Sequence, residues 1–558
     1  MVTPWWDPVH QTMWRLAGRS DLMELAAAAR RVAREVVSPA VAAGARSTHQ
    51  WTPEKARVLR ALDDAGLTSI FSRPNGGMVM PLAVALWELA WIDAGAAVCC
   101  MSGSLAHMAI RDIGTPEQQG RYLNNPALRH GALCLTEPLP GAGADAASLD
   151  GRIAVAEWEP GGQPVLDVEK RGRFTSHMNF AEFVAAAVDS RDARFHGSCL
   201  VILEPEDAGV FDRGVPVRKL GHQLSSTTNP VFHLKVPASR IVGGYTIEDD
   251  AIVPKFNHRE ALSATFRRAR AVMALVTSAK LLSALEAVIG APEQLLDLWA
   301  AGEAAASLGF SAARLSDELD HAETGRALLD LQAVVICPAA KLFSTEMASA
   351  MLPPAAAGLP GDKLIDAQLE ASYLGPAAIQ RRQISAFMID TAFLAEFAAW
   401  TRDMRQLAAH APWAGTVAAA MELWCWTLDR LRHTNDSRGA PIYREARQSI
   451  TFPMADGLCW LLAARALTLD VLTLRGKRPV ESFYFDLATV QAVHAGGQVA
   501  QLCTGLLFGH DPQVMLPHNL RETFTALRAK LDASFCGVML VRNQASEFIR
   551  QLDVSANR

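Results

Sequence analysis

The chain has 558 residues, which is too long for one ordinary domain and predicts about three or four compact units. Half of the residues are hydrophobic and a fifth are charged, so disorder on a large scale is excluded. The formal net charge of −5 is small and Lys and Arg are scattered, so the sequence shows no basic cluster of the kind that binds a nucleic acid. The nine cysteines are an odd number without paired spacings, which argues against a disulfide framework and against a zinc site.

The amino terminus lacks the basic start and apolar run of a secretory signal. Together with the cysteine pattern, this indicates a reducing compartment, and we expect a cytoplasmic protein. The longest uncharged stretch, residues 94–110, reaches barely the minimum length of a membrane span, about 17 residues, and is rich in Ala, Gly and Ser. We therefore predict a buried helix there and no transmembrane segment.

Apolar residues recur at helical spacing from Asp21 to about Leu123, which predicts an N-terminal helical domain over residues 1–130. The clearest stripe of this kind predicts one buried helix face and consists of Leu22, Leu25, Ala29, Val32 and Val36. Further along, Gly114-Thr115-Pro116-Glu117 has the composition of a helix start.

The pattern changes between about Gly131 and Gly244, where short apolar segments are separated by Gly, Pro and Asp. This is typical of strands and predicts a β domain over residues 131–245. The segments expected to form strands include residues 132–135, 183–188, 198–203 and 231–236.

Helical periodicity returns at Glu248 and predicts a bundle domain over residues 246–402. Its longest apolar stripe is Val272, Leu275, Val276, Ala279, Leu282 and Leu285. Helical segments at residues 418–431 and 455–472 predict an extra C-terminal helical domain over residues 403–558. The fold class is therefore mainly α with a central β domain.

One segment carries a recognisable motif: Cys134-Leu135-Thr136-Glu137-Pro138, followed by Gly141-Ala142-Gly143-Ala144-Asp145. It resembles the acyl-CoA dehydrogenase signature, in which Thr-Glu-Pro leads into Gly-Ala-Gly-Ser-Asp, although Leu139-Pro140 is inserted here. Further stretches resemble the same family in the same order, and these are residues 74–77, 88–90, 114–123, 221–243 and 368–382. The resemblance covers roughly the first 400 residues.

The tail resembles a larger type of this family. Residues 454–457, Met-Ala-Asp-Gly before an apolar helix, are similar to the C-terminal domain of very-long-chain acyl-CoA dehydrogenases. The resemblance implies a helical domain, a β-barrel and a four-helix bundle followed by the extra helical domain. It also implies FAD as cofactor, an acyl-CoA substrate, an electron-transferring flavoprotein as oxidant, and a homodimer.

The family reaction removes an α-proton from an acyl thioester with a carboxylate while the β-hydrogen leaves as hydride to flavin N5. It needs a carboxylate in a dry pocket and donors that hold the isoalloxazine ring. The resemblance implies that Thr136 faces the pyrimidine edge of the flavin, with the backbone of Leu135 nearby. The alternative is a strand-end Thr that satisfies a turn.

Phe174-Thr175-Ser176 stands where the family has an aromatic residue, a spacer and a Thr. The resemblance implies that Phe174 covers a flavin face and that Ser176 lies beside N5. A shift of one residue would make Thr175 the hydroxyl donor instead. The alternative for Phe174 is an ordinary side chain that anchors a strand.

The catalytic base is where this sequence departs from the family pattern. The usual Glu of Tyr-Glu-Gly-Thr corresponds to Leu374 in Tyr373-Leu374-Gly375-Pro376, and Leu374 cannot take a proton. A minority of the family carries the Glu at the start of the long bundle helix, where an ungapped count places Glu260. The alternative is a first-turn carboxylate favoured by the helix dipole. We expect Asp366 and Glu370 to be carboxylates on a helix surface.

Further departures concern the bundle side of the cofactor site. Glu286 stands where the family uses an Arg to hold the pyrophosphate, and Pro376 replaces the late Thr. Two hypotheses follow. The chain oxidises an acyl-CoA, or carries out a related flavin reaction on one, with Glu260 as base; alternatively, it is a catalytically impaired member with a structural or partner role.

Overall fold

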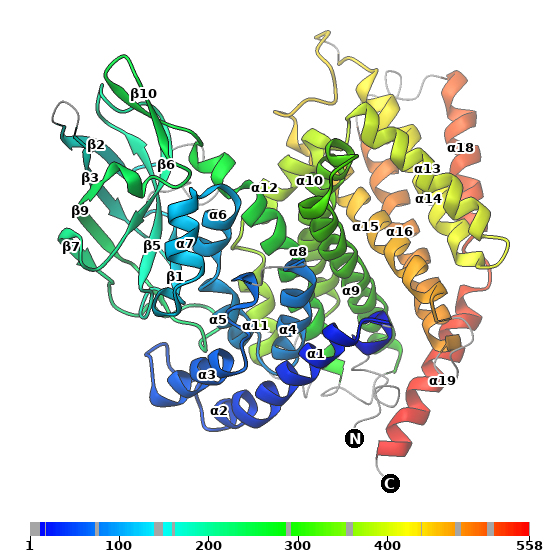
Figure 1. The fold of residues 1–558 in the computed structure, drawn as a ribbon. Coiled ribbons are helices and arrows are strands. Elements are labelled where there is room, and N and C mark those ends of the chain that lie inside the picture. The colour runs from blue at the N-terminus through cyan, green and yellow to red at the C-terminus, as the bar shows by residue number, and fades with distance from the viewer. Residues whose placement is uncertain are drawn as a thin grey trace. The chain divides into compact units, whose positions relative to one another are not determined.

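The computed structural model describes residues 12–16, 18–72, 77–138, 149–158, 162–285, 292–352, 361–436, 438–474, 481–509 and 518–556 (Figure 1). It divides into two compact units. The α/β unit comprises residues 21–272 with 374–376, and the helical unit comprises residues 1–20, 273–373 and 377–558. The helix α8, His258–Leu285, belongs to the α/β unit up to Val272 and to the helical unit from Met273.

The α/β unit begins with helices that end just before the first strand. Their bounds are α1 Ser20–Val32, α2 Ser38–Ala42, α3 Pro53–Asp64, α4 Val79–Ile92, α5 Ala94–Ser102, α6 Leu105–Ile113 and α7 Pro116–Leu123. The predicted helix start at Thr115 is confirmed, because its hydroxyl and the Gln118 side chain form a capping box at α7. Residues 94–110 are two buried helices, α5 and α6, separated at Gly103 and Ser104.

The buried helix face predicted from Leu22 to Val36 is correct over α1 and wrong at its last residue. Leu22, Leu25, Ala29 and Val32 are buried, but Val37 is buried in place of Val36. A π-helical turn, Ala33–Val37, follows α1 and lengthens the turn by about one residue, so the buried face moves along the sequence.

The β part of this unit is a curled sheet with two short strand pairs (Figure 1). Within the described residues its strands are β1 Gly131–Cys134, β2 Arg152–Glu157, β3 Val165–Arg171, β4 Thr175–Ser176, β5 Phe183–Ser190, β6 Ser198–Leu203, β7 Ala208–Asp212, β8 Thr227–Thr228, β9 Val231–Pro237, β10 Tyr245–Glu248 and β11 Ala251–Pro254. The main sheet has the order β1-β5-β2-β3-β9-β7, with β6 paired to β5. The pairs β4-β8 and β10-β11 are separate and antiparallel.

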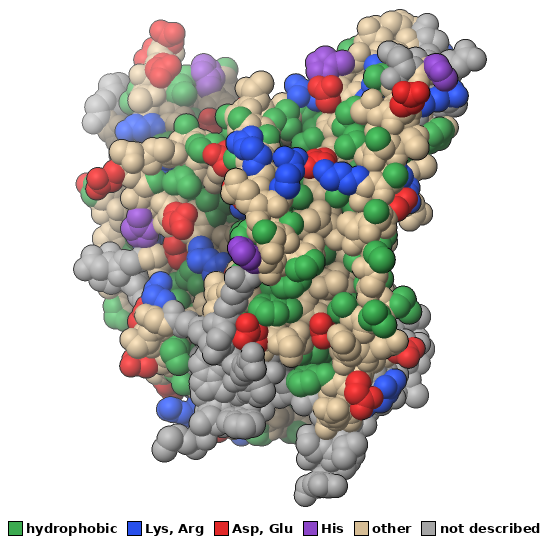
Figure 2. Space-filling view, turned by 90° about the vertical axis from the view of Figure 1, so that its right-hand side faces the viewer, with side chains coloured by type: hydrophobic (Ala, Val, Ile, Leu, Met, Phe, Trp, Pro, Cys, Tyr) green, Lys and Arg blue, Asp and Glu red, His purple; other side chains and the backbone are tan. Residues whose placement is uncertain are grey.

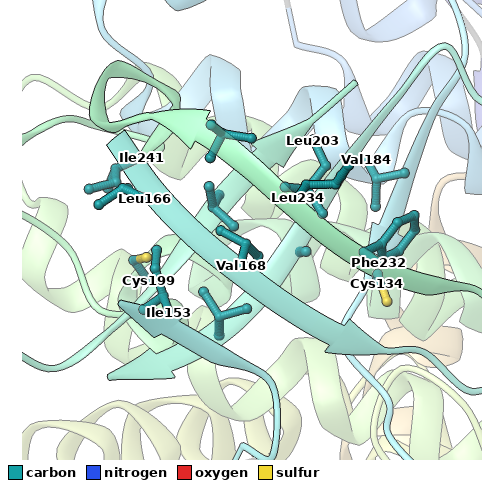
Figure 3. Close-up of a cluster of buried hydrophobic side chains, with 14 of the residues drawn as sticks. Cys134, Ile153, Leu166, Val168, Val184, Cys199, Leu203, Phe232, Leu234 and Ile241 are labelled. Atoms are coloured by element: carbon teal, nitrogen blue, oxygen red, sulfur yellow. The ribbon is translucent and has the colours of Figure 1, made fainter. Parts of the chain in front are cut away.

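A dry core fills the inside of this sheet (Figure 3). Side chains that alternate along β3 and β9, such as Leu166, Val168 and Leu234, meet Val184 from β5 and Leu203 from β6. The other face of β5 and β6 packs on α6, α7 and the start of α8. The strand β5 is therefore covered on both faces, which explains its unbroken apolar run.

The helical unit contains the bundle and the C-terminal helices. Their bounds are α9 Pro292–His321, α10 Arg326–Leu342, α11 Gly361–Glu370, α12 Ala377–Phe387, α13 Thr391–Leu407, α14 Pro412–Arg432, α15 Gln448–Leu472, α16 Glu481–Phe508, α18 His518–Ala533 and α19 Val538–Ala556. The helices α15 and α16 pack against α9 as well as against each other. The C-terminal helices therefore share a core with the bundle.

One described stretch of this unit, Arg326–Met351, is long and apolar enough to cross a membrane. Of its most apolar window, 61% is buried inside the structure. A core helix of a bundle passes the same test of length and composition.

The exposed face of the C-terminal helices mixes charges of both signs with hydrophobic side chains (Figure 2). Glu422 on α14 accepts from Lys530 on α18 at 2.5 Å and is also paired with Arg405 on α13. Basic residues here thus lie next to acidic ones.

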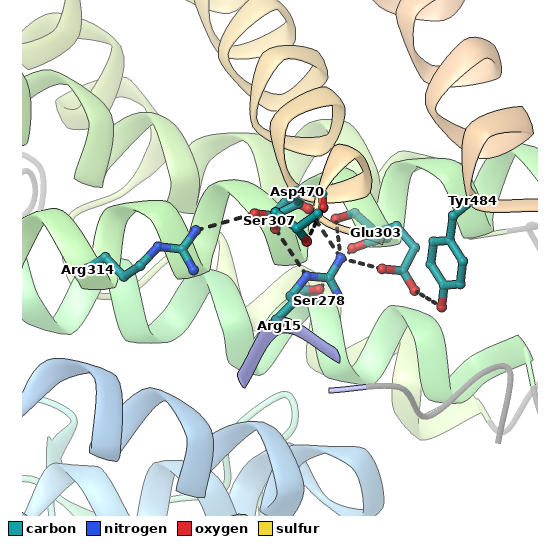
Figure 4. A network of polar contacts seen from close by, with 9 residues as sticks. Arg15, Ser278, Glu303, Ser307, Arg314, Asp470 and Tyr484 are labelled. Carbon is teal, nitrogen blue, oxygen red and sulfur yellow. Dashed lines mark hydrogen bonds and ion pairs between the residues drawn. The ribbon is translucent and has the colours of Figure 1, made fainter. Parts of the chain in front are cut away.

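Arg15 anchors the N-terminal segment to the helical unit (Figure 4). It lies on a short 3-10 helix, Thr12–Leu16, and its side chain is only 1% exposed. It donates to Glu303 of α9 at 2.5 Å and to Asp470 of α15 at 3.3 Å. Tyr484 of α16 lies 3.4 Å from Glu303. One guanidinium thereby ties the N-terminal segment to the bundle and to the C-terminal helices.

Replacement of Arg15 by Met should destabilise the helical unit by about 3–5 kcal/mol, because Glu303 would be left buried without its partner. Urea unfolding followed by circular dichroism measures this change. Replacement of the exposed Arg34 by Met is the control and should change stability by less than about 0.5 kcal/mol. Addition of Glu303→Leu to Arg15→Met should recover part of the loss, and no recovery would contradict the proposed cause.

Candidate functional site

The residues singled out from the signature motif lie at one edge of the β sheet, where β1 ends beside β4. Leu135 and Thr136 directly follow β1 and are half-buried. The carbonyl of Thr136 accepts from the backbone N–H of Arg173 at 2.8 Å, just before β4. We call residues 135–136, β4 and β8 the sheet edge.

A buried ion pair between Glu137 and Lys170 stabilises the sheet edge from inside the protein. Glu137 is 3% exposed and accepts from Lys170 of β3 at 2.5 Å. The same carboxylate accepts the backbone N–H groups of Asp150 and Gly151, each at 2.7 Å. Lys170 also donates to the carbonyl of Leu135 at 3.3 Å. The Glu of the motif therefore joins the end of β1 to the start of β2, a role that its sequence position did not reveal.

Close packing around this pair requires glycine. A Cβ on Gly151 would lie 2.6 Å from the Lys170 side chain and 3.1 Å from the carboxylate of Glu137. A Cβ on Gly172 would lie 2.6 Å from the sulfur of Cys134. The two distances of 2.6 Å are shorter than real Cβ contacts, so any larger residue at Gly151 or Gly172 would force its neighbours to shift.

Phe174 lies at the entrance to β4 with 48% of its surface exposed. Its backbone has a φ of 54°, which is uncommon for a residue other than glycine, and its N–H donates to the side chain of Asn229 at 2.9 Å. The Arg173 guanidinium lies 4.9 Å from the ring centre. Phe174 is thus presented at the surface and is not buried as a strand anchor.

The two hydroxyls of β4 point in different directions. Thr175 is 3% exposed and its hydroxyl faces the sulfur of Cys134 at 3.7 Å, inside the protein. Ser176 is half-buried and its hydroxyl lies 3.4 Å from that of Thr227 on β8. The Ser226 hydroxyl nearby is buried and has no hydrogen-bond partner among the described residues.

Glu260 lies in the first turn of α8 and is exposed. Its carboxylate accepts from the backbone N–H of Asn257 at 3.0 Å, and the Asn257 side chain accepts from Arg259 and Glu260 in return. This reciprocal arrangement is a helix cap. The structure therefore shows Glu260 in the first-turn role that was its structural alternative.

Leu374, the residue at the usual base position, adopts a left-handed backbone with a φ of 55° and is followed by Gly375 at 89°. The guanidinium of Arg270 on α8 donates to the carbonyl of Leu374 at 3.1 Å. The turn is thus held by its backbone.

The expectation that Asp366 and Glu370 lie on a helix surface is wrong. They are 6% and 0% exposed, on the helix α11. Glu370 pairs with the buried Lys280 of α8 at 2.5 Å, and this partner, 90 residues distant in sequence, compensates the burial of the carboxylate.

Several other sequence predictions fall outside the described residues. These are the residues Gly141 to Asp145, the inserted Leu139 and Pro140, the turn residues 74–76, and Glu286. Among the residues that the structure does describe, no group of three or more His, Cys, Asp or Glu side chains could hold a metal ion.

Sequence reasoning missed a buried histidine pair beside the sheet edge. His177, directly after β4, lies 3.0 Å from His130 through Nε2 and Nδ1. His130 in turn lies 3.2 Å from the carboxylate of Asp63. The three residues are spaced too far apart for a local motif, so only the fold reveals their contact.

Comparison with known proteins identifies relatives of the N-terminal helices and of the fold. Residues 20–128 match the family model "Acyl-CoA dehydrogenase, N-terminal domain". An acyl-CoA dehydrogenase from Bacillus anthracis complexed with FAD aligns with a TM-score of 0.74 at 15% identity, over 96% of this chain and 95% of that one. The chain has the acyl-CoA dehydrogenase fold.

Shorter acyl-CoA dehydrogenases align with a smaller part of the chain. Butyryl-CoA dehydrogenase from Megasphaera elsdenii gives a TM-score of 0.53 at 20% identity, over 66% of this chain and 98% of that one. A glutaryl-CoA dehydrogenase from Mycobacterium smegmatis in complex with FADH2 gives 0.53 at 17%, over 69% and 98%. The Bacillus anthracis protein covers nearly the whole chain, so the extra C-terminal helices of this larger acyl-CoA dehydrogenase fold have a counterpart there.

Replacement of Lys170 by Met should lower the free energy of unfolding by about 3–5 kcal/mol, because Glu137 would remain buried without its cation. Lys235→Met is a matched control, since Lys235 on β9 pairs with Glu157 at 2.8 Å but both side chains are more than half exposed. Its loss should be at most about 1 kcal/mol. Thermal unfolding of the two variants measures the difference, and equal losses would contradict the role given to the buried pair.

Proposed function

We propose that the chain binds FAD at the sheet edge and oxidises an acyl-CoA thioester to the α,β-enoyl-CoA. The observation that carries the proposal is that two half-buried residues with hydroxyl groups, Thr136 and Ser176, lie at the adjoining ends of β1 and β4. Hydroxyl and backbone N–H donors suit the oxygen and nitrogen atoms of an isoalloxazine edge. The residues present therefore fit the cofactor.

FAD would supply the hydride acceptor at N5. In this proposal Thr136, with the backbone of Leu135, holds the pyrimidine edge, and the exposed Phe174 ring covers one face. Ser176 donates beside N5, because its hydroxyl lies on the more open side of β4 while that of Thr175 points to Cys134. Lys170 and Glu137 act indirectly by fixing the strand ends.

Glu260 is the base in this proposal, since it is the carboxylate that the sequence resemblance implies in place of Leu374. To serve, its carboxylate must leave the cap and enter a drier environment that raises its proton affinity. An electron-transferring flavoprotein as oxidant and a homodimeric assembly belong to the same proposal. The visible spectrum of the purified protein, before and after addition of a panel of acyl-CoAs, tests it directly.

A second candidate function has its own support. Glu260 caps α8 and Leu374 cannot accept a proton, which is what a catalytically impaired member with a structural or partner role would show. Purification of the protein with stoichiometric FAD and turnover on its own would eliminate this candidate. Absence of substrate-induced bleaching from a yellow protein would favour it.

The two hydroxyls of β4 can be separated by a matched pair of variants. Ser176→Ala should slow substrate-induced flavin reduction about tenfold, which corresponds to the loss of one hydrogen bond of about 1.4 kcal/mol. Thr175→Val should leave the rate within about twofold, since its hydroxyl faces Cys134. Stopped-flow absorbance measures both rates. The reverse result would show that Thr175 is the donor.

Glu260→Gln should abolish substrate-induced bleaching while FAD stays bound, because an amide cannot accept the α-proton. Asn257→Ala is the control: it removes the helix cap at a cost of about 1 kcal/mol but keeps the carboxylate. It should retain the reaction. Full bleaching in Glu260→Gln, together with equal stability losses in the two variants, would show that Glu260 is only a cap.

A further inference from the structure

Four polar side chains from four separate segments, three of them buried, form a continuous chain behind the sheet edge. Ser102 at the end of α5 lies 3.5 Å from Nδ1 of His177. Nε2 of His177 lies 3.0 Å from Nδ1 of His130, and Nε2 of His130 lies 3.2 Å from Asp63 on α3. We call these four residues the histidine relay. Ser102, His130 and His177 are each at most 9% exposed.

Each residue of the histidine relay can donate a hydrogen bond to the next one, in the order Ser102, His177, His130 and Asp63. Asp63 also accepts from the hydroxyl of Thr68 at 2.5 Å; burial opposes its charge, but the hydrogen bonds from His130 and Thr68 outweigh this and lower its pKa. An ionised Asp63 only accepts, so His130 donates through Nε2, and in its neutral form it accepts at Nδ1. His177 must then donate through Nε2, which leaves its Nδ1 to accept from Ser102. Burial lowers the pKa of His177 well below its usual value and keeps the ring neutral.

Neighbouring residues pack closely against the ring of His177. A Cβ on Gly103 would lie 2.7 Å from Nε2 of His177, so only glycine leaves room for it. Phe180 meets the ring edge-on with centroids 4.2 Å apart, and Trp51 packs on Phe180 at 4.7 Å. His177 itself has a φ of 70°, an uncommon backbone conformation that the side-chain contacts hold in place.

The relay is joined directly to the sheet edge through the backbone. His177 follows Ser176, and its N–H donates to the carbonyl of Ser226 at 2.9 Å, immediately before β8. One residue, His177, is therefore bonded to both strands that carry the hydroxyls of Ser176 and Thr227.

We propose that His177 is a positioning residue for Ser176, and that proton uptake at His130 reverses the histidine relay and shifts the sheet edge. This inference rests on the proposed function. When His130 gains a proton, its Nδ1 becomes a donor that faces the Nε2–H of His177. Because His177 stays neutral, it must move its own proton to Nδ1, toward Ser102, or lose the contact. Either response changes how the residue after Ser176 is held.

The charges that face His130 come from every element around it. Asp63, with Arg129 3.9 Å from its other oxygen, lies at Nε2. Glu182, just before β5, accepts the backbone N–H of His130 at 2.5 Å. His177 lies at Nδ1, and the buried His107 is close enough to repel a charge on His130. Of these groups, Asp63 makes the only side-chain contact of opposite charge to the His130 ring that is described, so it is the residue to change.

The first test uses the wild-type protein and does not depend on flavin. Nitrogen NMR of the protein labelled with ¹⁵N-histidine reports which ring nitrogen carries the proton, with signals assigned by comparison with Asp63→Asn and His130→Asn proteins. At neutral pH, both His130 and His177 should be protonated at Nε2 and neutral. On acidification His130 should become doubly protonated, and His177 should move to the Nδ1 form or lose its bond. A proton on Nδ1 of His177 at neutral pH would overturn the relay.

The second test measures the rate of substrate-induced flavin reduction as a function of pH. The wild-type rate should fall as the pH is lowered through proton uptake at His130. In Asp63→Asn this fall should move to lower pH, because the anion that favours the proton is gone. His233→Asn is the control, since His233 on β9 is exposed beside Asp167 of β3, and its profile should match that of the wild type.

The outcomes separate the two proposals. A profile of Asp63→Asn that superimposes on that of the wild type would overturn the relay even if flavin reduction is normal. Expected tautomers in a protein that binds no FAD would overturn the proposed function and leave the relay intact. If Asp63→Asn does not fold, the tautomer measurement on the wild-type protein decides.

Discussion

The buried pair of Lys170 and Glu137 is the interaction on which the sheet edge depends. A carboxylate and an ammonium at this depth are tolerated only because every remaining oxygen meets a donor, and here those donors are the N–H groups of Asp150 and Gly151. The pair therefore connects three strands through one point, since Lys170 also reaches the carbonyl of Leu135. The same need for close approach explains the glycine at position 151, where a Cβ would meet the Lys170 side chain.

Much of the fold could be predicted because it depends on local periodicity. The expected strands at 183–188, 198–203 and 231–236 lie within β5, β6 and β9, and the stripe from Val272 to Leu285 is buried throughout α8. Local patterns fail where the backbone departs from the regular period. The π-helical turn after α1 is such a place, since it moved the buried face from Val36 to Val37 without any signal in composition.

The site was harder to predict because its chemistry depends on partners that lie far apart in sequence. The motif gave the position of Glu137 but not its function, which requires Lys170 from another strand. Glu370 looked like a surface residue because its cation, Lys280, lies 90 residues away on a different helix. The direction of a strand side chain was also ambiguous, and the pairing of β4 with β8 was needed to distinguish the buried Thr175 from the half-buried Ser176.

The sheet edge and the start of α8 differ in how they are held. The edge is fixed by the buried pair of Lys170 and Glu137 and by the backbone bonds to that pair, so Thr136 and Ser176 have few alternative positions. Glu260 is held only by an exposed cap, an interaction of about 1 kcal/mol that a substrate or a closing segment can easily replace. A rigid donor set with a loosely held carboxylate suits a reaction in which the flavin must be positioned before any proton moves. The same contrast would remain in a member that keeps the cofactor but has lost the base, so the reactivity of the bound flavin, rather than the shape of the edge, separates the two functions.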